Sequence, residues 1–210
     1  MTGNKKKQII VLDLDNTLIC SEAINEDYDP KDKKFIKKAE DFDKIEMDSY
    51  YMVFYRPYLQ EFLTFLFDNF TVSIWTAASK DYALFIIENI IIANYKNRKI
   101  DWIFFSYHCD ISKTLKNGTK DLSIIWDLYK LPGYSKYNTI IIDDYSEVYE
   151  TQPNNCFLIE PFNFKDNNSH KDKHLLTLQD GLAKLLENKK KTNSPAEELR
   201  KHIKATTKKR

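Results

Sequence analysis

Carboxylate side chains follow two of the most apolar stretches of the sequence. In "IIVLDLDNTLI", Asp13 and Asp15 come after a run of apolar residues, and the single residue between them places both carboxylates on the same side of an extended chain. Asp143 and Asp144 likewise follow an apolar run, at the end of the segment "TIIIDD". A buried carboxylate is costly unless something compensates its charge. These positions are therefore candidates for chemistry.

The apolar pattern predicts strands that alternate with helices. Five short runs are nearly continuous in apolar residues, as is typical of strands buried on both faces; they span 8–15, 71–77, 102–106, 139–144 and 156–160. Four longer segments show helical spacing of apolar residues, over 57–69, 80–96, 119–130 and 173–188. We therefore expect an α/β fold with a mostly parallel five-stranded sheet and helices on both faces.

Polar residues gather where such a fold binds its ligands, beyond the carboxyl ends of the strands. The residues at the predicted strand ends and at the start of one predicted helix are Asp13, Asp15, Thr17, Thr76, Lys120, Asp143 and Asp144. Each alone could be an ordinary turn, cap or solvated residue. Chance does not readily place them all at one sheet edge, so we expect four carboxylates, two hydroxyls and an ammonium to meet there.

Such a cluster restricts the chemistry of the site. Neighbouring carboxylates repel one another, and their pKa values rise unless a cation joins them. Oxygen ligands with room for water and a phosphate suit Mg²⁺, while a hydroxyl and an ammonium suit phosphoryl oxygens. The residues therefore favour phosphoryl transfer, in which a carboxylate can be the nucleophile and form an aspartyl-phosphate.

Four segments resemble, in order, the motifs of the haloacid dehalogenase (HAD) superfamily, whose fold is Rossmann-like: "DLDNTLI", "WTAASKDYA", "GTKDL" and "IIIDD". Two more, "FYRPYLQEFL" and "QPNNCFLIEPFN", are similar to the branch of RNA polymerase II C-terminal-domain (CTD) phosphatases and their small relatives, the FCP/SCP or NLI-interacting factor-like branch. The resemblance covers roughly residues 8–188. It implies a Mg²⁺-dependent phosphomonoester hydrolase, and within this branch a protein serine/threonine phosphatase.

The resemblance also assigns roles to the carboxylates. Asp13 would attack phosphorus. Asp15 would protonate the leaving alkoxide and then activate the water that hydrolyses the intermediate. Asp13, Asp143 and the backbone carbonyl of Asp15 would bind Mg²⁺.

The remaining motif residues would support the phosphate and the metal. Thr76, Ala77 and Lys120 would hold the phosphoryl oxygens, and Thr17 would support the site. Asp144 falls where the small CTD phosphatases often have Asn. Its additional charge would either sharpen metal dependence or hold Lys120.

Segment 20–55 interrupts the alternation of strands and helices, because it is charged at first and aromatic at its end. It is either a small inserted sheet or flap over the strand ends, or a solvated loop. In the resembling branch, this insert and residues after the second motif form a pocket for a proline beside phosphoserine. Tyr82 falls at a pocket tyrosine, whereas Ser79 falls at a position that is apolar in the small phosphatases. The implied substrate is a phosphoprotein, with phosphoserine of an RNA polymerase II tail as the specific candidate; alternatively, the aromatic residues only pack the insert onto the domain.

The end of the chain is basic, although the net charge of the whole is only +1. Residues 189–210 hold nine Lys or Arg against two Glu, so we expect a domain over 1–188 followed by a tail that is flexible or forms an exposed helix. Such a tail could contact nucleic acid, which makes a nucleic-acid end phosphatase one alternative function. A non-catalytic scaffold on a HAD fold is another, although intact Asp13 and Asp15 argue against it.

Composition bounds the remaining possibilities. Three cysteines that lie far apart argue against a disulfide framework and a structural zinc site. The most apolar run contains Glu88 and Asn89 and is too short to span a bilayer, and no signal peptide precedes the first strand. We expect an intracellular, soluble protein of the nucleus or cytoplasm with no membrane partner.

Overall fold

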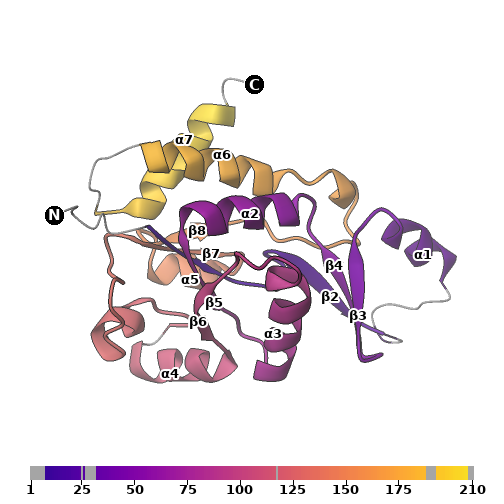
Figure 1. Ribbon diagram of the computed structural model, residues 1–210, viewed down its shortest axis with the longest axis horizontal. Helices are drawn as coiled ribbons and strands as arrows, with labels where there is room; N and C mark the ends of the chain where they lie inside the picture. The colour runs from indigo at the N-terminus through magenta and orange to yellow at the C-terminus, as the bar shows by residue number, and fades with distance from the viewer. Residues whose placement is uncertain (1–7, 25, 27–31, 117, 188–192, 208–210) are drawn as a thin grey trace.

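The main sheet of the computed structural model has five parallel strands in the order β6-β5-β1-β7-β8, which confirms the predicted α/β fold (Figure 1). The structure describes residues 8–24, 26, 32–116, 118–187 and 193–207. The strands are β1 (Ile9–Leu12), β5 (Thr71–Trp75), β6 (Ile100–Phe104), β7 (Thr139–Asp143) and β8 (Cys156–Leu158). β1 stops three residues before its predicted end, because the chain turns out of the sheet at the first acidic motif.

Side chains of the central strand β1 alternate between two apolar clusters, as expected for a strand buried on both faces. Ile10 and Leu12 join one cluster, whereas Ile9 and Val11 join the other. The helices that contribute to the first cluster are α2 (Leu59–Asn69), α3 (Lys80–Ile86), α6 (His174–Glu187) and α7 (Pro195–Thr207). Those that contribute to the second are α4 (Ser106–Lys116) and α5 (Ser146–Thr151). The sheet is therefore covered on both faces.

Two of the four predicted helices are confirmed and two differ from the prediction. α2 and α6 lie where the sequence placed them, but the segment 80–96 is α3 followed by a π-helical turn over Ile87–Ile92. The helix expected over 119–130 forms only in part, because a π-helical turn spans Ile124–Leu128 while Lys120, expected at the start of the helix, has a left-handed φ of 56°. Within the described part of the chain, no helix is both long enough and apolar enough to cross a membrane.

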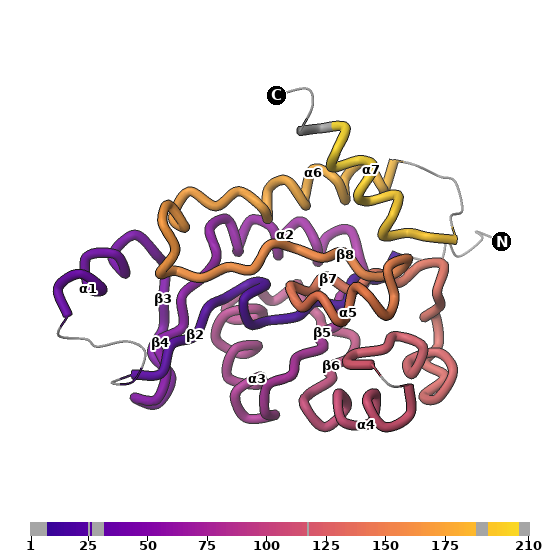
Figure 2. Tube along the Cα trace, turned by 180° about the vertical axis from the view of Figure 1, so that it is seen from behind, coloured from indigo at the N-terminus to yellow at the C-terminus, as the bar shows by residue number. Residues whose placement is uncertain are grey.

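The segment 20–55 forms a small antiparallel sheet, so the solvated-loop alternative is wrong. Its elements are β2 (Ile19–Ala23), α1 (Lys33–Ala39), β3 (Lys44–Met47) and β4 (Tyr51–Tyr55), with strand order β2-β4-β3. Aromatic side chains of the insert form a small buried cluster with the segment after β8, in which the rings of Phe54 and Phe164 stack with centroids 3.8 Å apart. Figures 1 and 2 show the insert projecting at the end of the molecule opposite α7.

A buried arginine fixes the insert to the rest of the domain. Arg56, directly after β4, is 1% exposed and donates to the backbone carbonyls of Thr17 and Glu160 at 3.0 and 2.8 Å. It also forms an ion pair with Asp172 at 2.8 Å. Burial raises the pKa of Asp172, but hydrogen bonds from His174 and Arg56 outweigh it and lower the pKa to about 2. The insert, the first motif loop and the segment before α6 are therefore held by one charged group.

The basic C-terminal segment is part of the folded domain over Pro195–Thr207. Ala196 and Leu199 of α7 are fully buried in the main core, and Arg200 donates to the backbone carbonyls of Cys156 and Pro153 at 2.9 and 3.0 Å. The expectation of a flexible tail or an exposed helix is therefore wrong for these residues, because the basic composition concealed one apolar face. Of the rest of the predicted tail, 189–192 and 208–210 lie outside the described residues.

Truncation of Leu199 tests whether α7 belongs to the core. We expect Leu199→Ala to lower the free energy of unfolding by about 2–5 kcal/mol, because it leaves a cavity among α6, α7 and the sheet. Urea unfolding measures the change. Lys204→Ala, on the exposed side of the same helix, is the control and should cost at most about 0.5 kcal/mol. If the free energy of unfolding of Leu199→Ala fell no further than that of Lys204→Ala, Leu199 would add nothing to the core.

Candidate active site

Parallel pairing brings the two acidic motifs to one level of the sheet. Leu12 pairs with Ile142 of β7, so the residues that follow them, Asp13 and Asp143, emerge side by side. The backbone N–H of Asp13 donates to the carbonyl of Ile142 at 3.0 Å, which continues the ladder one residue beyond β1. Leu12 also pairs with Ile74 of β5, which places the start of the second motif beside the first.

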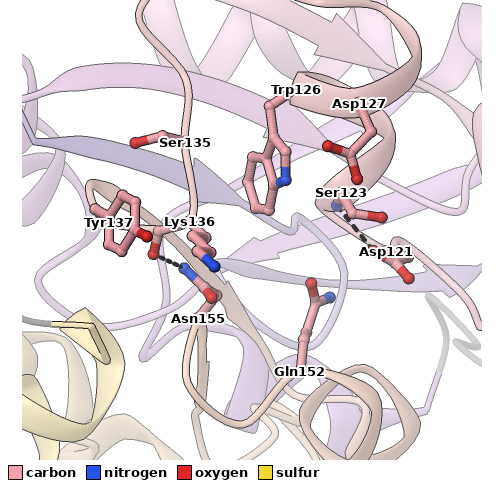
Figure 3. Close-up of a pocket in the computed structure, with 9 residues that line it drawn as sticks. All are labelled: Asp121, Ser123, Trp126, Asp127, Ser135, Lys136, Tyr137, Gln152 and Asn155. Carbon is pink, nitrogen blue, oxygen red and sulfur yellow. Dashed lines mark hydrogen bonds between the residues drawn. The ribbon is translucent and has the colours of Figure 1, made fainter.

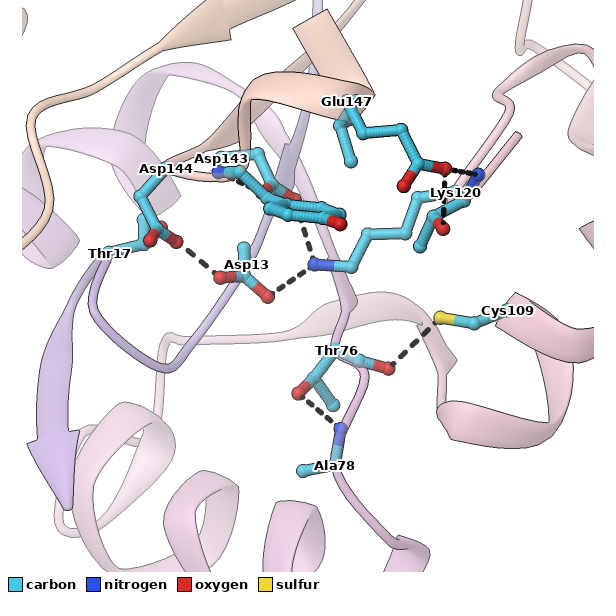
Figure 4. A network of polar contacts seen from close by, with 12 residues as sticks. Asp13, Thr17, Thr76, Ala78, Cys109, Lys120, Asp143, Asp144 and Glu147 are labelled. Atoms are coloured by element: carbon cyan, nitrogen blue, oxygen red, sulfur yellow. Dashed lines mark hydrogen bonds and ion pairs between the residues drawn. The ribbon is translucent and has the colours of Figure 1, made fainter. Parts of the chain in front are cut away.

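The ammonium of Lys120 lies between the two neighbouring aspartates (Figure 4). Its Nζ is 2.6 Å from Oδ1 of Asp13 and 2.7 Å from Oδ2 of Asp143. All three residues are at most 5% exposed. Burial lowers the pKa of Lys120, but the two carboxylates outweigh it and raise the pKa above its ordinary value. The lysine is therefore charged, and its charge stabilises two carboxylates that would otherwise repel one another.

A third carboxylate extends this pair to an acidic cluster. Oxygen atoms of Asp13, Asp143 and Asp144 lie within 4.8 Å of one another. The hydroxyl of Thr17 is 3.2 Å from both Oδ2 of Asp13 and Oδ1 of Asp144, so it ties the first motif to the fourth. Burial, together with the charge of Asp13, raises the pKa of Asp143 to about 7 and raises that of Asp144 as well. The cluster therefore favours the binding of a further cation.

The second aspartate of the first motif is set apart from this cluster. Leu14 and Leu18 are fully buried and anchor the loop that carries Asp15. The hydroxyl of Tyr82 donates a short hydrogen bond to Oδ1 of Asp15 and is itself hydrogen-bonded to the hydroxyl of Ser21 in β2. Burial raises the pKa of Asp15 to about 6, although the hydrogen bond from Tyr82 lowers it. Asp15 is therefore partly protonated near neutral pH, as a general acid needs.

The threonine of the second motif directly follows β5 at the same sheet edge. Thr76 is fully buried, and its backbone N–H donates to the carbonyl of Phe104 at 3.0 Å. Its hydroxyl accepts a hydrogen bond from the N–H of Ala78 at 3.0 Å. Among the contacts of the described residues this hydroxyl is only an acceptor, so its hydrogen remains for a ligand. Ala77, the other predicted phosphate contact, is exposed beside it.

Several residues that hold the site in place were not found from the sequence. They come from α4, α5 and the insert and are Ser21, Ser112, Glu147 and Gln152. Gln152 begins the segment "QPNNCFLIEPFN", whose resemblance to the CTD phosphatases was its only signal. Tyr82 was predicted to line a substrate pocket; in the structure its hydroxyl donates to Asp15, and its ring lies edge-on to that of Tyr51, with centroids 5.7 Å apart.

The donor set of the acidic cluster fits Mg²⁺. Oxygen-only ligands are those that Mg²⁺ prefers, and three carboxylates with one ammonium leave a net charge of −2 when all are ionised. One divalent cation balances that charge. Asp144 belongs to this cluster through Thr17, whereas the ion pairs of Lys120 are to the other two aspartates.

Comparison with known proteins gives this arrangement a family context. The family described as NLI interacting factor-like phosphatase matches residues 8–193. CTD phosphatase-like protein 355R of Invertebrate iridescent virus 6 is 47% identical over 176 residues, which cover 82% of this chain and 96% of the viral protein. Ubiquitin-like domain-containing CTD phosphatase 1 of Homo sapiens is 32% identical over 126 residues, 59% of this chain and 39% of that protein.

A solved structure shares the fold. Fcp1, described as an essential RNA polymerase II CTD phosphatase, matches with a TM-score of 0.54 and 20% sequence identity, over 97% of this chain and 62% of that chain. The sequence comparisons confirm the expected branch of the HAD superfamily, and the structural match confirms its fold.

Removal of the Lys120 charge tests the electrostatic balance of the site. We expect Lys120→Met to lower the free energy of unfolding by about 3–5 kcal/mol at pH 7.5 without metal, because it leaves buried carboxylates unpaired. Asp143 has a folded pKa raised above its unfolded value, so the folded state loses stability as the pH rises through about 7. The loss in Lys120→Met should therefore be smaller at pH 5 than at pH 7.5.

Urea unfolding at the two pH values measures this difference. Lys113→Met, which removes an exposed lysine from α4, is the matched control and should change the free energy of unfolding by no more than about 0.5 kcal/mol. A loss in Lys120→Met that is the same at both pH values would contradict the role of Asp143.

Proposed function

The chain belongs to the NLI interacting factor-like phosphatase family and is a HAD-type phosphatase, and we propose that it hydrolyses phosphomonoesters through an aspartyl-phosphate on Asp13. The observation that carries this proposal is the setting of Asp13. Its carboxylate is buried at the carboxyl end of β1, where it is oriented by Lys120 on one oxygen and by Thr17 on the other. A carboxylate held in this way is a preorganised nucleophile.

In the first step, a carboxylate oxygen of Asp13 forms a bond to phosphorus while the bond from phosphorus to the leaving oxygen breaks. Asp15 gives its proton to that oxygen, so the product departs as a neutral alcohol. Lys120 and the hydroxyl of Thr76 stabilise the charge on the phosphoryl oxygens.

In the second step, Asp15 acts as a base. It takes a proton from water, the water oxygen attacks phosphorus, and the bond between Asp13 and phosphorus breaks. Inorganic phosphate leaves, and both aspartates return to their starting protonation states.

We infer that Asp13, Asp143 and Asp144, with the backbone carbonyl of Asp15, hold Mg²⁺. The support is the oxygen-only donor set and its excess negative charge. When bound, Mg²⁺ neutralises negative charge on the phosphoryl group. Lys120 would remain a fixed cation at Oδ1 of Asp13.

The proposed substrate is a phosphorylated serine or threonine of a protein, with the RNA polymerase II tail as the specific candidate. The support is the similarity to proteins named as CTD phosphatases. Aromatic side chains of the insert also lie near the acid, since Tyr51 of β4 contacts Tyr82, which donates to Asp15. Activity in the nucleus or cytoplasm is part of this proposal.

A substrate panel tests the reaction and its substrate class. Phosphoserine, phosphothreonine and phosphotyrosine peptides and 5′- and 3′-phosphorylated oligonucleotides are compared with and without Mg²⁺, with release of inorganic phosphate as the measurement. We expect turnover of the serine and threonine peptides with Mg²⁺. Asp13→Asn should reduce it to background while circular dichroism shows an intact fold. Preference for oligonucleotides would instead support a nucleic-acid end phosphatase, and hydrolysis by Asp13→Asn at the parent rate would exclude Asp13 as nucleophile.

The acid role of Asp15 is tested with leaving groups of different basicity. We expect Asp15→Asn to lower kcat/KM about 10²- to 10⁴-fold for a phosphoserine peptide, whose alkoxide must be protonated. The loss for nitrophenyl phosphate should be much smaller, because nitrophenolate leaves without a proton. Asp144→Asn, which removes a carboxylate but not the acid, is the control and should affect both substrates alike. Equal losses for both substrates in Asp15→Asn would remove Asp15 from the acid role.

A further inference from the structure

The backbone of Lys120 has a conformation that a lysine rarely adopts. Its φ is 56°, in the left-handed region, although the residue has a Cβ. This conformation costs an L-residue other than glycine roughly 1–2 kcal/mol. Such a conformation persists only where surrounding contacts fix it, and it is frequent at functional sites. The contacts that fix Lys120 therefore set where its ammonium lies.

One side-chain amide spans the backbone on both sides of this turn. Nε2 of Gln152 donates to the carbonyl of Lys120 at 2.7 Å, and Oε1 of Gln152 accepts from the N–H of Leu122 at 3.0 Å. The amide thus satisfies a backbone acceptor and a backbone donor that no helix or strand pairs at this point. A flexible turn is thereby given a single conformation.

Two other side chains complete the support of the turn. The hydroxyl of Ser112 in α4 donates to the carbonyl of Gly118 at 2.6 Å and accepts from the N–H of Asp121 at 2.8 Å. Glu147 of α5 accepts from the N–H and the hydroxyl of Thr119 at 3.1 and 3.0 Å. Of these contacts, only that of Gln152 reaches the backbone of Lys120 itself.

Gln152 also connects the turn to the acidic cluster through the chain. It caps the C-terminus of α5, and α5 begins shortly after Asp143 and Asp144. Gln152 is joined to Asp143 through the chain of α5 and is hydrogen-bonded to the backbone carbonyl of Lys120. The ammonium of Lys120 in turn is hydrogen-bonded to Asp143. A shift of the Gln152 amide would move the ammonium relative to both aspartates.

We propose that Gln152 is a positioning residue, which fixes the left-handed turn and thereby holds the Lys120 ammonium between Asp13 and Asp143. This proposal rests on the proposed phosphatase reaction. The side-chain hydrogen bonds of Gln152 are to the backbone of Lys120 and Leu122 and not to the acidic cluster, so it acts through Lys120. Its removal should weaken the stabilisation of phosphoryl oxygens without removing the nucleophile or the acid.

The same pocket offers a matched control. Gln152 and Asn155 both line a pocket of about 540 Å³ between the Lys120 turn and the segment before β7 (Figure 3). Nδ2 of Asn155 donates to the carbonyls of Lys136 and Thr139, both at 2.8 Å. Gln152→Ala and Asn155→Ala therefore each remove an amide with two hydrogen bonds to the backbone, but only the first loosens Lys120.

The test compares these two variants with Lys120→Ala and with the double variant Gln152→Ala/Lys120→Ala. Steady-state kinetics with nitrophenyl phosphate and Mg²⁺ give kcat/KM, and competition gives the inhibition constant of inorganic phosphate. We expect Gln152→Ala to lower kcat/KM about 10- to 100-fold, as for other residues that orient a catalytic group, and to raise the inhibition constant. Asn155→Ala should keep both near the parent values.

The double variant distinguishes positioning from general stability. If Gln152 acts through Lys120, its removal should cost nothing further in Lys120→Ala. Gln152→Glu is a second variant of the same size, which keeps the acceptor for Leu122 but faces the Lys120 carbonyl with a carboxylate oxygen, and we expect a loss similar to that of Gln152→Ala. Equal losses in Gln152→Ala and Asn155→Ala, or a full additional loss in the double variant, would overturn the proposal.

A second measurement separates this proposal from the proposed reaction. Inorganic phosphate should raise the melting temperature of the parent and of Asn155→Ala, but not of Gln152→Ala. If these melting-temperature shifts were seen but the parent protein hydrolysed no phosphomonoester, the positioning role would be supported and the proposed reaction refuted.

The parent could instead be active while its Gln152 variants kept the same kcat/KM and the same phosphate-dependent shift in melting temperature. That outcome would refute the positioning role and leave the proposed reaction standing.

Discussion

The buried ion pairs of Lys120 with Asp13 and Asp143 are the interaction on which the site depends. Two ionised carboxylates side by side at the end of a buried sheet would repel strongly, because the surroundings screen them poorly. The ammonium lies within 2.7 Å of both and makes their proximity tolerable. It does not neutralise the whole cluster, since Asp144 adds a third carboxylate. The remaining negative charge makes the binding of a second cation favourable.

The topology of the sheet explains why these charges meet. From β1 the chain proceeds outward to β5 and β6, then returns across the sheet to β7 on the other side of β1. The strand order therefore reverses at β1, which is where open α/β sheets bind ligands. Asp13 and Asp143 end the two adjacent strands at this reversal. Lys120 lies in the connection that leads from β6 back to β7. This connection includes α4 and packs against the face of the sheet opposite to α2 and α6.

The features that the sequence predicted are those that depend on local pattern. Apolar runs identified the buried strands, and acidic residues placed after them identified the site, because parallel strands present their ends at one edge. The turn at Lys120 was expected to open a helix, since apolar residues at 122, 125 and 128 recur at helical spacing, whereas the contacts that hold the turn come from α4 and from Gln152 after α5. α4 itself was missed, because it buries few residues and its sequence is largely polar. α7 was judged by its charge, although Leu199 and Ala196 form a buried face. These errors share one cause, which is that tertiary contacts decide the conformation of segments with weak local patterns.

The insert is connected to the chemistry through the acid rather than through the nucleophile. Ser21 of β2 is hydrogen-bonded to Tyr82, and Tyr82 donates to Oδ1 of Asp15. Burial holds the pKa of Tyr82 above its ordinary value, so the tyrosine stays protonated throughout the range in which Asp15 titrates. Because Oδ1 accepts this hydrogen bond, the proton that Asp15 transfers in the proposed reaction belongs on Oδ2. Ser21 belongs to the insert and Tyr82 to α3, so these two hydrogen bonds link the insert to the acid, whereas Asp13 follows β1 and is paired with Lys120. In the proposed reaction, the insert is therefore linked to the acid, whereas the nucleophile is held by the main sheet and Lys120.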